Sequence, residues 1–323
     1  MSMIQATSPS AVSKDQNPQP VLQPGENTLW ESFWCLSQDG LKLHARLYGS
    51  HMRQVQPMVC LPVVCLPGLT RNAADFHELA VELSTRKTRA RQVLALDYRG
   101  RGRSEYDSNP ANYDISIEMQ DVQDVLTAAG IHQAILVGTS RGGLITMALS
   151  AVRPGLIKGA VLNDIGPVLE GKGLARIKGY VGKLPLPKDF AEAVQLLKRI
   201  SSQHFTRLTE AEWDVFARRT FKEQGGRLLP DYDPQLMKTL DAIDLEKPLP
   251  TLWPYFEGLK GVPVLSIRGQ NSDLFTAETQ AEMARRHPGM ESHIVVGEGH
   301  APLLNDRPTL QKILSFVAAV DAA

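Results

Sequence analysis

Residues 134–143 constrain the fold of this chain more than any other segment. An apolar, partly β-branched run ends at Gly138, Ser140 follows between small residues, and residues 144–149 have helical character. The pattern Gly-x-Ser-x-Gly between a predicted strand and a predicted helix indicates a sharp turn with Ser140 at its apex, because Gly138 and Gly142 leave room for close backbone packing. The alternative is a glycine-rich turn whose serine has no chemical role.

A serine on such a turn is held above the sheet edge, where a base can reach its hydroxyl and the start of the next helix offers backbone N–H groups. A hydroxyl is a poor nucleophile at neutral pH, so it needs a base, and the base needs an acid to orient it. A chemical role for Ser140 therefore requires a histidine and an acid at the ends of other strands.

The chain around this turn alternates strands with helices. Residues 29–36 and 41–48 predict a hairpin closed by an Asp-Gly turn. Later strands are continuously apolar, which is typical of strands covered on both faces in a parallel sheet. We therefore predict an α/β fold whose mostly parallel central sheet has helices on both faces, with strands at 58–66, 92–96, 133–137 and 159–163 and helices at 72–86 and 115–129.

This alternation stops at about residue 166 and resumes after residue 260, with strands at 262–267 and 293–296. We find no convincing strand in between, only helical patches separated by loops rich in Gly and Pro. We predict a helical cap at 166–260, inserted into an α/β core formed by 27–165 and 261–323. Candidate residues for lining a pocket under the cap are its aromatics, namely Trp213, Phe216, Trp253, Tyr255 and Phe256.

Residues 1–26 are rich in Ser, Gln and Pro and predict a disordered N-terminal extension without the apolar segment of a signal peptide. We find no apolar run long enough to span a bilayer, which predicts a cytoplasmic protein without membrane insertion. Three cysteines in apolar segments predict buried thiols rather than a disulfide framework or a zinc site (Cys35, Cys60 and Cys65).

The charges of the chain balance, with 35 Lys+Arg and 35 Asp+Glu. A net charge of zero gives no support to nucleic acid as a partner. The basic run 99–103 is interrupted by glycines and neighboured by Asp97, Glu105 and Asp107, which predicts a solvated loop. We expect a small-molecule substrate, no metal or organic cofactor, and a monomer or homodimer.

Of the eight histidines, His300 is the best placed to serve Ser140. It follows the predicted strand 293–296, and the glycines before it allow the loop to turn its imidazole towards the sheet. The acid should precede this histidine in the chain. Asp273, just after the strand 262–267, is the preferred candidate.

Asp164 is the alternative acid, because it too follows a predicted strand. The competing interpretation of Asp164 is a role in the turn Asn-Asp-Ile-Gly-Pro. Two backbone donors would complete the site as an oxyanion hole, namely the N–H of Arg141 and that of Leu69, which Gly68 allows to approach closely. The Arg141 side chain is predicted to pair with a carboxylate, the alternative being contact with a polar substrate.

Five motifs stand in the order found in the α/β-hydrolase superfamily, which the chain resembles from about Leu29 to its C-terminus: Leu-Pro-Gly-Leu-Thr (66–70), Asp-Tyr-Arg-Gly-Arg-Gly-Arg-Ser (97–104), Gly-Thr-Ser-Arg-Gly-Gly (138–143), Arg-Gly-x-x-Ser-Asp (268–273) and Gly-His-Ala-Pro (299–302). The resemblance implies Ser140 as nucleophile, His300 as base, Asp273 as acid and a helical cap. One departure is Pro67 where the oxyanion loop of the family usually has histidine. Another is Arg141 directly after the nucleophile.

The serine turn and the Asn-Asp-Ile-Gly-Pro segment most resemble capped bacterial carboxylesterases. That resemblance implies hydrolysis of short to medium acyl or aryl esters through an acyl-enzyme, and some such enzymes cleave aliphatic polyesters. Carbon–carbon bond or lactone hydrolysis by the same triad stays open. A ligand-binding signalling protein that retains the triad is a less favoured alternative.

Overall fold

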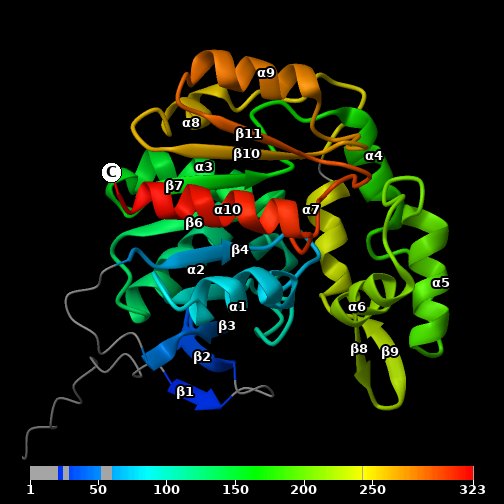
Figure 1. Ribbon diagram of the computed structural model, residues 1–323. Helices are drawn as coiled ribbons and strands as arrows, with labels where there is room; N and C mark the ends of the chain where they lie inside the picture. The colour runs from blue at the N-terminus through cyan, green and yellow to red at the C-terminus, as the bar shows by residue number, and fades with distance from the viewer. Residues whose placement is uncertain (1–20, 25–28, 52–59, 242, 323) are drawn as a thin grey trace, which may run out of the picture.

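The computed structural model describes residues 21–24, 29–51, 60–241 and 243–322. Its main element is a nine-stranded sheet with the strand order β1-β2-β3-β5-β4-β6-β7-β10-β11 (Figure 1). The strands are β1 (Val21–Pro24), β2 (Trp30–Leu36), β3 (Lys42–Tyr48), β4 (Val63–Leu66), β5 (Val93–Asp97), β6 (Ala134–Thr139), β7 (Ile157–Asn163), β10 (Val264–Gly269) and β11 (Glu291–Val295). Pairing is antiparallel from β1 to β5 and parallel from β5 to β11, so the predicted mostly parallel sheet is confirmed.

Strand β1 falls within the segment predicted to be disordered. It pairs antiparallel with β2, Val21 lying opposite Trp34. Residues 21–24 therefore extend the sheet, whereas residues 1–20 and 25–26 of the predicted extension lie outside the described residues.

Helices cover both faces of the sheet. On one face α1 (His77–Thr85) and α10 (Arg307–Val320) share an apolar cluster with Val63 and Cys65 of β4, and on the other α2 (Ile115–Ala128) and α3 (Arg141–Val152) share one with Val64 and Leu66. Figure 1 shows α1 and α10 in front of the sheet. Helix α9 (Ala277–Arg286) covers β10 and β11. All four residues of β4 are buried, which explains the continuous apolar run in the sequence.

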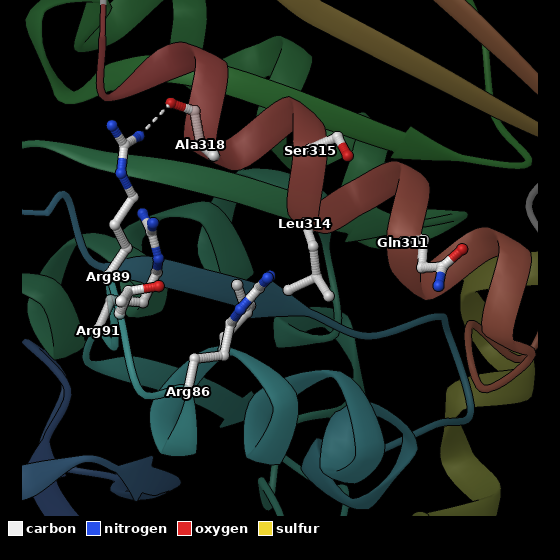
Figure 2. Close-up of a pocket in the computed structure, with 9 residues that line it drawn as sticks. Arg86, Arg89, Arg91, Gln311, Leu314, Ser315 and Ala318 are labelled. Carbon is white, nitrogen blue, oxygen red and sulfur yellow. Dashed lines mark hydrogen bonds between the residues drawn. The ribbon is translucent and has the colours of Figure 1, made fainter.

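The loop after α1 contacts the end of α10 across a surface pocket of about 350 Å³ (Figure 2). Arg91 forms an ion pair of 2.7 Å with Asp321, and Arg89 donates a hydrogen bond of 2.8 Å to the Ala318 carbonyl. These contacts fix the end of α10 against the edge of the sheet where the parallel strands begin.

Residues 166–260, the inserted segment, connect β7 to β10. Its helices are α4 (Gly171–Tyr180), α5 (Phe190–Ser201), α6 (Glu210–Thr220), α7 (Met237–Asp241) and α8 (Trp253–Glu257). In Figure 1, α4 to α7 lie beyond one end of the sheet, whereas α8 packs against α3.

The inserted segment also contains a hairpin, so the prediction that it has no strand is wrong. Strands β8 (Phe221–Gln224) and β9 (Arg227–Pro230) pair antiparallel. Gly225 and Gly226 connect them with φ angles of +59° and +71°. A two-residue turn of this kind requires positive φ at both positions, which glycine adopts without strain.

The three cysteines are buried and free, as predicted. Burial raises the pKa of Cys35 to about 12, which keeps its thiol protonated. None of the helices in the described ranges is long and apolar enough to cross a membrane.

Gly142 lies where α3 crosses β4. A Cβ atom at this position would overlap the backbone carbonyl of Leu66, whereas one at Gly155 would meet no atom within 4 Å. We expect Gly142→Ala to lower the free energy of unfolding by about 2–3 kcal/mol, because the added methyl group forces α3 away from the sheet. Gly155→Ala should change it by less than about 0.5 kcal/mol. Urea unfolding measures both variants, and equal stabilities would contradict this close approach.

Candidate active site

Ser140 stands at the turn between β6 and α3, as predicted. Its φ of 50° and ψ of −111° are sparsely populated for a residue with a side chain. The turn is held by the Ser140 N–H, which donates to the Asn163 carbonyl at 2.9 Å, and by the Ser140 carbonyl, which accepts from the Gly143 N–H at 2.9 Å. The hydroxyl is thereby presented at the carboxyl edge of the sheet.

A chain of two hydrogen bonds connects Ser140 to a buried acid. The Ser140 Oγ lies 2.9 Å from His300 Nε2, and His300 Nδ1 lies 2.8 Å from Asp164 Oδ2. His300 belongs to the loop after β11, and Asp164 directly follows β7. The Asp164 side chain has no exposed surface and that of His300 is 7% exposed, so water competes little for either contact.

Further contacts fix Asp164 in place. Its Oδ1 accepts from the Gly269 N–H at 2.7 Å, and its Oδ2 also accepts from the Ser272 hydroxyl at 2.6 Å. Its φ of 53° is held by its own N–H, which donates to the Ile267 carbonyl at 2.8 Å. Ser272, which stands next to Asp273 and donates to the other acid, was not among the predicted site residues.

Asp273 has a different partner from the one predicted. Its carboxylate accepts two hydrogen bonds from Arg176 of α4, at 2.6 and 2.9 Å. Burial acts to raise the pKa of Asp273, but Arg176 outweighs this effect, and the pKa lies below its ordinary value. The acid that hydrogen-bonds to His300 in the structure is Asp164, the alternative, and not the preferred Asp273.

Ser140 and His300 open onto a cavity of about 400 Å³. Most residues around it are apolar and come from both the sheet edge and the inserted segment, among them Leu144, Ile165, Leu174, Ile177, Leu197 and Leu252. Of the predicted aromatics, Phe216 lines the cavity. The other four do not: Trp213 and Phe256 are buried in the protein interior, Trp253 is partly buried against the core, and Tyr255 is exposed.

The two predicted backbone donors also meet at this cavity. Leu69 and Arg141 both line it next to Ser140. A Cβ atom on Gly68 would lie 3.9 Å from the Ser140 Cβ, so the loop after β4 passes close to the serine. The structure therefore brings together Ser140, His300, Leu69 and Arg141.

The sequence model of the alpha/beta hydrolase family matches residues 63–311 of this chain. The chain belongs to this family. It is 34% identical over 284 residues to 3-hydroxybutyrate-oligomer hydrolase of Cupriavidus necator, covering 84% of this chain and 92% of that protein. It is 25% identical over 254 residues to 2-(acetamidomethylene)succinate hydrolase of Mesorhizobium japonicum, covering 78% and 86%. A crystal structure of an alpha/beta hydrolase from Novosphingobium aromaticivorans superposes with a TM-score of 0.82 at 36% identity, covering 90% of this chain and 98% of the other.

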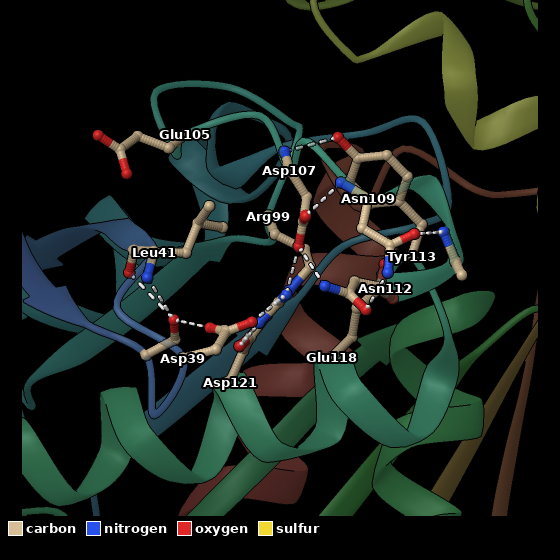
Figure 3. A network of polar contacts seen from close by, with 12 residues as sticks. Asp39, Leu41, Arg99, Glu105, Asp107, Asn109, Asn112, Tyr113, Glu118 and Asp121 are labelled. Atoms are coloured by element: carbon tan, nitrogen blue, oxygen red, sulfur yellow. Dashed lines mark hydrogen bonds and ion pairs between the residues drawn. The ribbon is translucent and has the colours of Figure 1, made fainter.

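In this hydrolase the basic run 99–103 is only in part the predicted solvated loop: Arg103 is exposed, whereas the other two arginines are buried, contrary to prediction. Arg99 and Arg101 are 1% and 0% exposed. Figure 3 shows Arg99 among acids from three other segments: Asp121 at 2.5 and 2.6 Å, Asp107 at 2.7 Å and Asp39 at 2.9 Å. The sequence shows the charges of these acids but not that the fold gathers them around one guanidinium.

The Arg141 side chain pairs with a carboxylate, as predicted. Its Nε donates to Glu118 of α2, and its Nη2 donates to the Tyr113 carbonyl at 2.7 Å. The side chain therefore points into the protein interior, and the predicted alternative of a contact with a polar substrate is not supported.

Glu298 supports the loop that carries His300. Its side chain is 6% exposed, and its Oε2 accepts a hydrogen bond from the Leu303 N–H at 2.8 Å. Burial raises the pKa of Glu298 from 4.5 to about 7. The folded protein thus binds this proton more tightly than the unfolded chain does.

Replacing each of the two acids with asparagine should separate their roles. We expect Asp164→Asn to slow labelling of Ser140 by a fluorophosphonate roughly 10³–10⁴-fold, because the amide can no longer stabilise a charged His300. Asp273→Asn makes the same chemical change next to Arg176 and should leave the labelling rate within about tenfold. Rapid labelling of the Asp164 variant together with slow labelling of the Asp273 variant would instead identify Asp273 as the acid that serves His300.

Glu298 makes stability depend on pH. Its contribution is full below pH 4.5, its unfolded-state value, and is lost as the pH rises through the folded-state pKa of about 7. We expect the wild type to lose about 2 kcal/mol of stability relative to Glu298→Gln between pH 5 and 8. Urea unfolding of both proteins at the two pH values measures this difference. A constant difference would mean that Glu298 ionises in the folded protein without cost.

Proposed function

We propose that this hydrolase cleaves carboxylic esters through an acyl-enzyme formed on Ser140. The observation that carries the proposal is the hydrogen-bond chain from Ser140 through His300 to Asp164 at the wall of an apolar cavity. A buried acid, an imidazole and a serine in this order are the groups that activate a hydroxyl for attack on an acyl carbon.

The proposed reaction has two similar halves. His300 Nε2 takes the proton of Ser140 as Oγ attacks the ester carbonyl, and then delivers it to the leaving alcohol. Asp164 stabilises the charged imidazole through Nδ1. Water then attacks the acyl-enzyme, with His300 again as base, and releases the acid and free Ser140.

The developing negative charge needs donors fixed before the reaction. In our proposal these are the backbone N–H groups of Leu69 and Arg141, which come from the loop after β4 and from the first residue of α3. The positive end of α3 supports the same charge.

The cavity favours apolar esters of modest size. Its volume of about 400 Å³ and its leucine and isoleucine walls suit short to medium acyl chains or a small aryl group. The similarity to 3-hydroxybutyrate-oligomer hydrolase over most of both chains supports short oligoesters of hydroxy acids as a substrate class. Residues of α4, α5 and α6 contribute to the walls, so in this proposal the inserted segment serves as the cap.

Turnover of p-nitrophenyl esters from acetate to decanoate, and of 3-hydroxybutyrate dimer and trimer, tests the proposal. We expect the wild type to hydrolyse both types, with a preference for short to medium chains. Ser140→Ala should lose roughly 10⁴-fold or more in kcat and all fluorophosphonate labelling. A folded wild type that cleaves none of these esters, or a Ser140→Ala variant that retains activity, would refute the proposal.

A further inference from the structure

The two proposed oxyanion donors belong to elements far apart in the chain. Leu69 lies in the loop after β4, and Arg141 is the first residue of α3. Donors to an oxyanion act only when their separation is fixed to within about half an ångström. Contacts between the loop and the helix, and not chain connectivity alone, must therefore fix the separation of the two donors.

Arg101 holds the loop from inside the protein. It has no exposed surface, its Nε donates to the Leu69 carbonyl at 2.8 Å, and its Nη1 donates to the Arg99 carbonyl at 2.7 Å. The Gly68 carbonyl accepts from the Arg71 N–H at 3.1 Å, which fixes the peptide plane that carries the Leu69 N–H. Pro67, where the family usually has histidine, offers no side-chain donor to do this.

Glu118 of α2 connects this arginine to the helix. Its Oε1 accepts from Arg101 Nη1 at 2.5 Å, and its Oε2 accepts from Arg141 Nε. The carboxylate has no exposed surface. One side chain is thus bonded to both arginines, through a different oxygen for each.

The electrostatics of the Arg101–Glu118–Arg141 cluster indicate a geometric role. Burial acts to raise the pKa of Glu118, but Arg101 and Arg141 outweigh it and lower the pKa, so the carboxylate is ionised. Buried ion pairs add little net stability, because their desolvation offsets their attraction. Moreover, Arg101 Nη2 is buried without a hydrogen-bond partner among the described residues, an arrangement that costs stability.

We propose that Glu118 is a positioning residue that sets the separation of the Leu69 and Arg141 backbone donors through Arg101 and Arg141. The inference rests on the proposed ester hydrolysis. It predicts that loss of the Glu118 charge weakens the stabilisation of a tetrahedral adduct while leaving ester binding and the Ser140–His300–Asp164 contacts in place.

The test is Glu118→Gln, which keeps the shape of the side chain but turns one acceptor oxygen into a donor facing a guanidinium. We expect kcat on the best p-nitrophenyl ester to fall about 10–100-fold with KM nearly unchanged, a smaller loss than removal of a donor outright. The affinity of a trifluoromethyl ketone, which forms a tetrahedral adduct on Ser140, should fall by the same factor. The pH profile of kcat/KM should not move, because the Ser140–His300–Asp164 contacts stay in place.

Asp121→Asn is the matched control. Asp121 is on the same helix, is 2% exposed and also pairs with an arginine, Arg99. Its carboxylate does not bond to Leu69, Arg101 or Arg141. We expect this variant to keep kcat and ketone affinity within about threefold. If Glu118→Gln lost no more than Asp121→Asn on both measures, the positioning role would be overturned.

Arg141→Met provides a second route if Glu118→Gln does not fold. It removes the link to Glu118 while keeping the Arg141 backbone N–H, and it should reproduce the loss of kcat and ketone affinity at unchanged KM. Retention of both within about threefold would overturn the inference. A wild type without ester turnover would refute the proposed function and this inference together, whereas an active wild type with unaffected variants would refute the inference alone.

Discussion

The close approach of α3 to β4 and β6 is the constraint on which the rest of the site depends. Cβ atoms at Gly138 and Gly142 would overlap the backbone of the facing element, so a side chain at either position would force the serine turn apart. Ser140 accepts a strained φ of 50° to bridge these elements. In return its hydroxyl reaches His300, and Arg141 comes to the same cavity wall as Leu69.

Tertiary contacts decide which aspartate hydrogen-bonds to His300. Asp164 and Asp273 follow the neighbouring parallel strands β7 and β10, whose pairing ends at Asn163 and Ile267. Local sequence therefore places both near His300, and the preference for Asp273 that it suggested was wrong for the contact with His300. Partners distant in the chain decide which acid faces His300. Gly269 and Ser272 donate hydrogen bonds to Asp164, whereas Arg176, 97 residues away, donates to Asp273.

Local signals sufficed for strands β2 to β11 of the nine-stranded sheet, the serine turn and His300, because a strand, a glycine turn and a helix each leave a short-range pattern, whereas the short strand β1 was missed. The β8–β9 hairpin had such a signal too, in the Gly225-Gly226 pair. Its strands have only four residues each, too short for alternation to stand out among helical neighbours. The burial of Arg99 and Arg101 had no local signal. Glycines and nearby acids are equally typical of an exposed turn.

These buried arginines separate two tasks of the interior. The apolar layers on either face of the sheet supply the free energy of folding, but apolar contacts tolerate small sliding movements because they have no preferred direction. Hydrogen bonds between guanidinium and carboxylate are directional and often bidentate, so they fix distance and angle together. Around Arg99 they join α2 to the loops at Asp39 and Asp107. Arg101 joins α2 to the loop after β4 by donating to the Glu118 carboxylate and to the Leu69 carbonyl. The charges thus align elements that the apolar core merely holds together, and they do so beside the serine turn, where alignment matters for chemistry.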